Sequence, residues 1–123
     1  MDQRTFERTA SAPSAADLDK SARPPLPALT ISFAVADADW RPSVAAAVLA
    51  AQAHKPDAAF DVVTPVPVNS ARDVQDRFIR QGEDDSALVA RELQANGVPP
   101  ERITIGLRGD PGNPPRQVEL FVH

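Results

Sequence analysis

Cysteine and tyrosine are both absent from the 123 residues, and tryptophan and methionine each occur once. Without cysteine, the chain forms no disulfide, carries no thiol nucleophile and offers no thiolate to a metal ion. Long apolar runs are missing as well, because no stretch approaches the roughly 20 residues that a membrane-spanning helix needs. The sequence therefore predicts a chain without disulfides and without a transmembrane segment.

The formal net charge is −4, from 13 basic and 17 acidic side chains. General nucleic-acid binding needs a basic face, so this balance argues against nucleic acid as the partner. No spacing of histidines, acids or glycines matches a catalytic, metal-binding or phosphate-binding motif. The sequence favours a non-enzymatic module without a cofactor or a metal ion.

Alanine, serine and proline dominate the first part of the chain, in the run TASAPSAADLDKSARPPLP that ends at residue 27. Such a segment buries too little apolar surface to offset its ordering entropy. We therefore predict a disordered tether over residues 1–27 and one domain over residues 28–123. The first residues also lack the apolar stretch of a signal peptide, which leaves a cytosolic chain or a chain whose targeting segment has been removed.

Four segments have the pattern of strands. Residues 29–35 alternate between apolar and polar positions, which predicts a strand with one buried face. Residues 59–64 are nearly continuous in apolar side chains, as in a central strand, and Pro65 and Pro67 are expected to end the ladder. RITIGL and VELFV each place three apolar side chains on one face and predict two further strands at residues 102–107 and 118–122.

Two segments have helical spacing. Residues 43–54 present Val44, Val48 and Leu49 on one face, and Pro42 suits the first position of a helix, where its missing N–H costs nothing.

The second helical segment covers most of residues 69–97. Ser70 is the expected N-cap, and Gly82 is expected to break or kink the helix. Asp84 or Asp85 would then cap a second piece, and Gly97 would adopt the left-handed conformation after its end.

These elements follow one another as β-α-β-α-β-β. The strands separated by helices imply crossover connections and parallel pairing. The last two strands are joined by a loop of about eight residues, which is compatible with an antiparallel pair. The predicted fold class is therefore α/β (α+β), a two-layer sandwich of helices on a mixed sheet.

Three stretches resemble the OmpA-like C-terminal domain of bacterial envelope proteins. Residues 29–63 look like that family's opening strand, helix and second strand. LVARELQANGVPPERI is similar to its second long helix with the Gly-hydrophobic exit. PPRQVELFV resembles its closing Arg-Arg-Val-Glu strand, in which Arg116 and Glu119 match and Gln117 departs. The resemblance covers residues 28–123 and implies an OmpA-like layout.

The family binds the diaminopimelate of peptidoglycan non-covalently, with an Asp in a Thr-Asp-x-x-Gly loop and an Arg in the second helix. Carried onto this chain, the loop falls at Asn69-Ser70, with no Asp or Gly in register, and the helix Arg falls at Asp85. An acid there would repel the ligand's carboxylate. The resemblance therefore implies a binding or scaffold module of the periplasm or outer-membrane periphery, with an envelope protein as partner and without strong peptidoglycan binding.

Two other functions stay open at this point. VVTPVPVNSA, followed by the Gly-Val exit, also resembles the lipoprotein that accompanies the secretin of tight-adherence pilus systems, so the chain could be an accessory lipoprotein of a pilus or secretion system. A cytosolic protein-interaction subunit is the third alternative.

The candidate binding residues follow the second predicted strand, because ligands of open α/β sheets favour the carboxyl ends of strands. They are Asn69, Ser70, Arg72 and Asp73, with Asp85 at the family's ligand position. The simpler interpretation is a serine cap with solvated charges.

Three other features have simple structural explanations. Trp40 is either a contact anchor or a ring packed over the start of a helix. Helix-end electrostatics explain His54 and the acids at 83–85 more simply than a metal site does. Neither His54 nor His123 has convergent partners for metal binding or catalysis.

Overall fold

The computed structural model describes residues 26–34 and 38–123 of this chain. The tether predicted over residues 1–27 lies outside the described residues, apart from Leu26 and Pro27. The described part is an α+β fold of two helices and a four-stranded mixed sheet, as predicted. Its elements are β1 (Leu29–Ser32), α1 (Arg41–His54), β2 (Phe60–Pro67), α2 (Arg72–Ala95), the 3₁₀ turn η3 (Pro100–Arg102), β3 (Ile103–Asp110) and β4 (Gln117–Val122).

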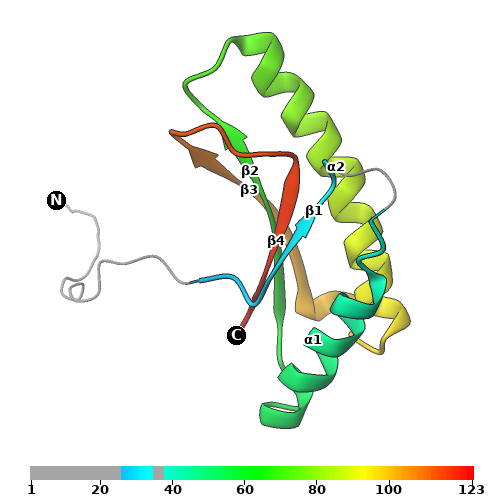
Figure 1. The fold of residues 1–123 in the computed structure, drawn as a ribbon. Helices are drawn as coiled ribbons and strands as arrows, with labels where there is room; N and C mark the ends of the chain where they lie inside the picture. Colours follow the sequence, from blue (N-terminus) through cyan, green and yellow to red (C-terminus); the bar gives the residue numbers. More distant parts are fainter. Residues whose placement is uncertain (1–25, 35–37) are drawn as a thin grey trace, which may run out of the picture.

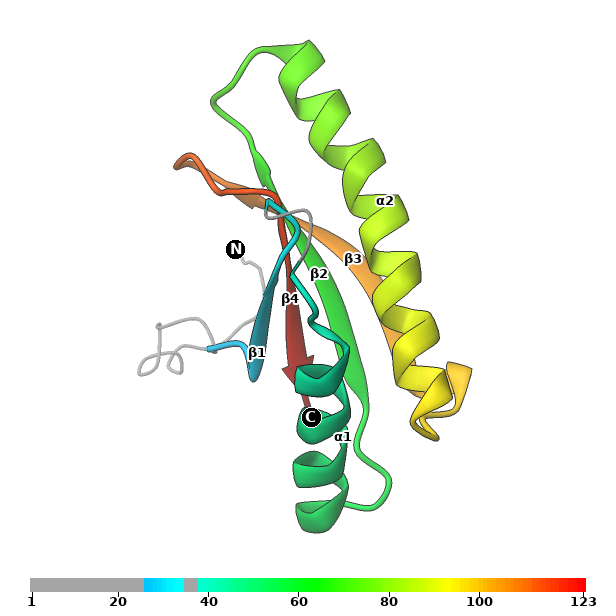
Figure 2. The same ribbon diagram turned by 45° about the vertical axis from the view of Figure 1, so that its right-hand side comes forward.

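The strands lie in the order β1-β4-β2-β3 across the sheet. β3 is parallel to β2, whereas β4 is antiparallel to both of its neighbours, β1 and β2. Consequently β1 and β2 run in the same direction with β4 between them. Both helices lie on the same side of the sheet (Figures 1 and 2), which gives two layers.

The core fills the space between the two helices and the sheet. Val44 and Val48 of α1 and Val89 and Leu93 of α2 are buried there. The strands contribute alternate residues to the same cluster: Ile31, Phe60, Val62, Val118 and Leu120. Leu49, which was predicted on the buried face of α1, is instead 75% exposed. The buried stripe of α1 consists of residues four apart, and Leu49 lies about 100° around the helix from Val48.

The predicted antiparallel pairing of residues 103–107 with 118–122 is wrong. β3 pairs with β2, and β4 occupies the slot between β1 and β2. The parallel neighbour predicted for strand 59–64 is confirmed as β3, but β1 pairs with the antiparallel strand β4. The exposures agree with this order: Val118 and Leu120 are 0% exposed in the central strand β4, whereas Ile105 and Leu107 are each 52% exposed in the edge strand β3. The more apolar strand takes the central position, and the short loop before it crosses β2 to reach that position (Figure 1).

The two prolines of β2 do not end the strand, contrary to prediction. Residues Pro65 and Pro67 both pair with β3. The backbones of Ala59 and His123 exchange two hydrogen bonds, so the odd-numbered residues of β2 direct their N–H groups toward β4. Pairing with β4 ends at Val63. Proline therefore occupies positions at which no ladder hydrogen bond would form.

α2 is one continuous helix of 24 residues, so the predicted break at Gly82 is wrong. A Cβ atom at Gly82 would lie 2.5 Å from Cγ2 of Thr64, which shows that the glycine permits a close approach of α2 to β2. The N-cap is Ala71 and has no side-chain hydrogen bond, so the predicted cap at Ser70 is also wrong.

The predicted left-handed end of α2 is confirmed. Gly97 has a φ of 94°. The N–H of Val98 donates to the carbonyl of Leu93, and the N–H of Gly97 donates to the carbonyl of Gln94, which together form a Schellman motif. Val98 and Leu93 are both buried, so this turn also closes one end of the core.

Candidate functional site

The predicted binding loop lies at the end of the sheet where β2 leaves for α2. The side-chain amide of Asn69 donates to the carbonyl of Pro111, and the N–H of Val68 donates to the carbonyl of Asp110. The loop after β2 is thereby fastened to the loop after β3. These hydrogen bonds fix the backbone where β2 and β3 end.

The start of α2 is held by Gln75 rather than by the predicted serine cap. The amide of Gln75 donates to the carbonyls of Val68 and Ser70. Arg72 and Asp73 are exposed. The structure therefore brings Asn69, Ser70, Arg72 and Asp73 together as a solvent-facing surface, which we call the β2–α2 loop surface.

Asp85, the fifth predicted residue, does not belong to that surface. It lies 12 residues beyond Asp73 on one helix, which is about 18 Å along the axis. Its side chain is only 3% exposed and faces the sheet. A cap at Asp84 or Asp85 is also excluded, because both residues are inside α2.

Arg116, directly before β4, neutralises Asp85. Its Nε donates to one carboxylate oxygen at 2.9 Å, and its Nη2 donates to the other oxygen at 2.8 Å. This is the bidentate geometry in which arginine binds carboxylates most strongly. The hydrogen bonds to Asp85 raise the pKa of Arg116. The side chain of Arg116 is 40% exposed, so the pair has one buried and one solvated partner.

A second polar contact lies beside this pair in the interface between α2 and the sheet. The hydroxyls of Thr64 and Ser86 are 3.2 Å apart, and both residues are buried. Sequence reasoning missed both contacts. The sequence does contain a signal for them: Asp85 and Ser86 lie on the same helix face as the buried residues 82, 89 and 93 of α2. Polar groups on a buried face need hydrogen-bond partners.

Aromatic and guanidinium groups surround a cavity of about 330 Å³ next to Arg116. The rings of Phe33 and Trp40 are 5.7 Å apart, and the guanidinium of Arg41 lies 4.9 Å from the centroid of Trp40. Trp40 packs against the core at the start of α1, which is the packing explanation of its role, and its ring also lines this cavity. The carboxylate of Glu92 lies 3.7 Å from Nε of Arg41. The charge of this second arginine at the cavity is therefore balanced by an acid.

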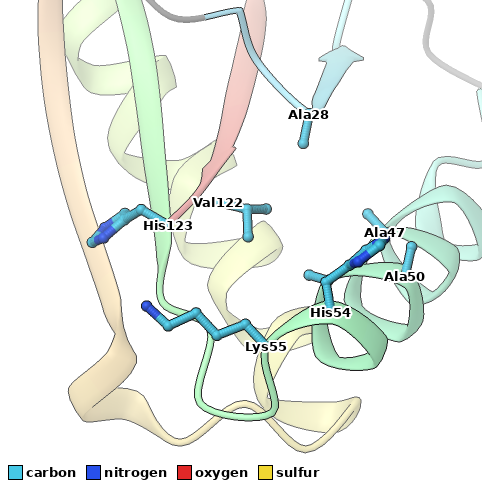
Figure 3. A pocket seen from close by; sticks show the side chains of 8 residues that line it. Ala28, Ala47, Ala50, His54, Lys55, Val122 and His123 are labelled. Atoms are coloured by element: carbon cyan, nitrogen blue, oxygen red, sulfur yellow. The ribbon is translucent and has the colours of Figure 1, made fainter.

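A second cavity, of about 400 Å³, lies between the end of α1 and the sheet (Figure 3). Alanines and Val122 form most of its wall, and His54, Lys55 and His123 contribute the polar groups. His54 and Lys55 come from the end of α1, opposite Val122 of the sheet (Figure 3). The ring of His123 points away from the cavity (Figure 3), and its Nε2 lies 3.1 Å from the carboxylate of Asp61.

The open face of the sheet carries a further ion pair. Nη2 of Arg108 donates to both carboxylate oxygens of Glu119, at 2.9 and 3.1 Å. These hydrogen bonds are the main cause of the raised pKa of Arg108. Glu119 is thus satisfied within the sheet rather than directed at a ligand.

No group of three or more His, Cys, Asp or Glu side chains that could hold a metal ion occurs in residues 26–34 and 38–123. The acids at 83–85 diverge around α2, since Glu83 and Asp84 are exposed and Asp85 is buried. Across the part of the chain that the structure describes, neither helix could cross a membrane.

Comparison with known proteins gives no match to any family model and none to a curated protein sequence.

Proposed function

We propose that this chain is a non-enzymatic binding or scaffold module of the bacterial cell envelope. In this proposal it is an OmpA-like domain in which an internal ion pair replaces the usual diaminopimelate site. The single observation that carries the proposal is the bidentate pair of Asp85 and Arg116. The envelope setting rests on the sequence resemblance over residues 28–123.

The replacement differs from simple charge reversal. An exposed acid at the family's arginine position would repel a carboxylate ligand, but Asp85 is buried and its charge is balanced by Arg116. Both carboxylate oxygens already accept hydrogen bonds from one guanidinium. A diaminopimelate carboxylate would meet neither a free cation nor a strong repulsive charge at this position.

The β2–α2 loop surface is the proposed contact site for an envelope protein. Its backbone is fastened through Asn69 and Gln75, while Arg72 and Asp73 remain exposed. A backbone that is already fixed loses little further conformational entropy on binding, which favours recognition of a partner.

The first experiment measures binding of the purified chain to sacculi that contain diaminopimelate, beside a family member that retains both ligand residues. We expect saturable binding by the family member and none by this chain at the same protein concentration. Saturable binding of this chain would refute the replacement of the site.

The second experiment tests the β2–α2 loop surface in an envelope fraction. The chain carrying a photo-crosslinker at the exposed position Asp73 should capture a defined protein, and Arg72→Glu should abolish that capture. Arg77→Glu, at another exposed arginine of α2, is the matched control and should leave capture unchanged. A captured protein that is indifferent to Arg72→Glu would exclude this surface as the contact site.

A further inference from the structure

β3 forms one edge of the sheet, and its outer side has no neighbouring strand in the described part of the chain. The even-numbered residues of β2 direct their N–H and C=O groups toward β3, since the odd-numbered ones face β4. In the observed parallel register, Val62 is the partner of Ile105. Its two hydrogen bonds therefore go to residues 104 and 106. It follows that Ile105, Leu107 and Gly109 direct their own backbone groups away from the sheet.

This edge carries Arg108 and Asp110 but lacks three other features with which proteins protect a free strand, namely shortness, proline and a bulge. β3 has eight residues, contains no proline and pairs with β2 without a bulge from Ile103 to Asp110. Ile105 and Leu107 lie on the helix side of the sheet, as their partners Val62 and Thr64 do, and about half of each side chain is exposed. The opposite edge, β1, is only four residues long. A long edge strand with half-exposed apolar residues favours pairing with another strand.

We propose that β3 joins two copies of this chain, as an antiparallel pair related by a two-fold axis at Gly106. Because the outward-facing residues are odd-numbered, two copies can pair only in registers that match odd with odd. Two such registers overlap most of the strand, centred on Gly106 or on Leu107. Only the one centred on Gly106 pairs Ile105 with Leu107 of the second copy, and Leu107 with Ile105. These four half-exposed side chains lie on one face and cover one another, as cross-strand neighbours do.

The charges of the strand fit the same register. If the pairing continues by one residue before Ile103, Arg102 lies opposite Asp110 of the second copy. The two-fold axis produces this Arg–Asp pair twice. Arg108 comes opposite Thr104, so no two like charges face each other. A sequence that complements itself in backbone, apolar and charged positions favours a second copy over an unrelated extended peptide. The resulting sheet would have eight continuous strands.

This inference is independent of the proposed function and is tested on the full chain by sedimentation across a concentration series. We expect a reversible monomer–dimer equilibrium. Leu107→Lys acts twice in a symmetric dimer and should raise the dissociation constant by about tenfold or more. Leu49→Lys, at an exposed leucine of α1, is the matched control and should leave the constant unchanged. A chain that stays monomeric up to millimolar concentration, or a dimer that survives Leu107→Lys, would overturn the proposal.

A charge exchange tests the register. Arg102→Asp and Asp110→Arg should each weaken the dimer by about fivefold or more, and the double variant should recover most of the loss. Asp110 also lies 3.6 Å from Arg108 of its own chain and accepts a hydrogen bond from the N–H of Gly112, so circular dichroism must first show that each variant is folded. Failure of the double variant to recover, with all proteins folded, would exclude this register.

Amide hydrogen exchange separates a second copy from other occupants of the edge. The amides of Ile105, Leu107 and Gly109 should become more protected as the protein concentration rises. Protection that is already complete in the monomer would show that the chain's own preceding segment covers β3, and this result would refute the dimer.

Discussion

Replacing Arg116 by glutamine removes the partner of the buried Asp85 carboxylate and leaves the carboxylate in place. Asp85 is 3% exposed, so water cannot take over the two hydrogen bonds that the guanidinium donates. The opposite change, Asp85→Asn, leaves Arg116 without its counter-charge, but 40% of that side chain already faces solvent. The two substitutions break the same ion pair but should lower the free energy of unfolding by different amounts.

The size of each cost follows from the burial of the group that is left behind. A charge stranded in a protein interior costs about 3–5 kcal/mol when its partner is removed. Partial solvation around Arg116 lowers this figure, and we expect Arg116→Gln to reduce the free energy of unfolding by about 2–4 kcal/mol. Asp85→Asn keeps one acceptor for the solvated guanidinium and should cost about 1 kcal/mol.

Urea unfolding at pH 7, followed by circular dichroism, measures both values, and the double variant completes a mutant cycle. Asp85→Asn combined with Arg116→Gln should be more stable than Arg116→Gln alone, because no buried charge remains. Equal costs for the two single variants, or a larger cost for Asp85→Asn, would refute this account of the pair.

Three further predictions test the packing at other positions of the domain. Gly82→Ala should lower the free energy of unfolding by about 1–3 kcal/mol in thermal melts, because the new Cβ would lie 2.5 Å from Thr64. In an ordinary helix the same substitution stabilises by about 1 kcal/mol, so a more stable variant would contradict the close approach. Gly97→Ala should cost about 1–2 kcal/mol because φ is 94° there, and Gly97→Asn should cost less; equal melting of all three proteins would rule out the left-handed turn. Val48→Ala should cost about 2 kcal/mol, whereas Leu49→Ala should stay within about 0.5 kcal/mol of the native chain; the reverse order would place the wrong face of α1 in the core.

Features that depend on neighbours along the chain could be predicted from the sequence. Proline near the start of α1 and glycine after the end of α2 act through their own backbone geometry. The structure has Gly97 where it was expected and Pro42 at the second position of α1, one residue after the predicted first position. The order of helices and strands follows from apolar periodicity, which is also local. The residues of the β2–α2 loop surface could be placed together for the same reason, since they are close in the chain.

Features that depend on distant residues could not be predicted in this way. The prolines of β2 and Gly82 have strong local tendencies to interrupt a strand and a helix, yet neither does so. Pro65 is tolerated because pairing with β4 has already ended at Val63. Gly82 is tolerated because the helix needs a small residue opposite Thr64. In both cases the tertiary neighbour decides, and the sequence does not reveal which neighbour that is.

The ion pair of Asp85 and Arg116 depends on the position of β4 in the sheet. A β3–β4 hairpin, as the short connecting loop suggested, would place β4 beyond β3 at the edge of the sheet. In the structure β4 lies between β1 and β2, and Arg116 at its start reaches the buried face of α2. Strand order therefore brings the guanidinium to Asp85. Because β4 occupies this central position, β3 lies at the edge of the sheet, with Ile105 and Leu107 half exposed. The internal ion pair and the exposed edge thus have one cause, the insertion of β4, the more apolar of the last two strands, between β1 and β2.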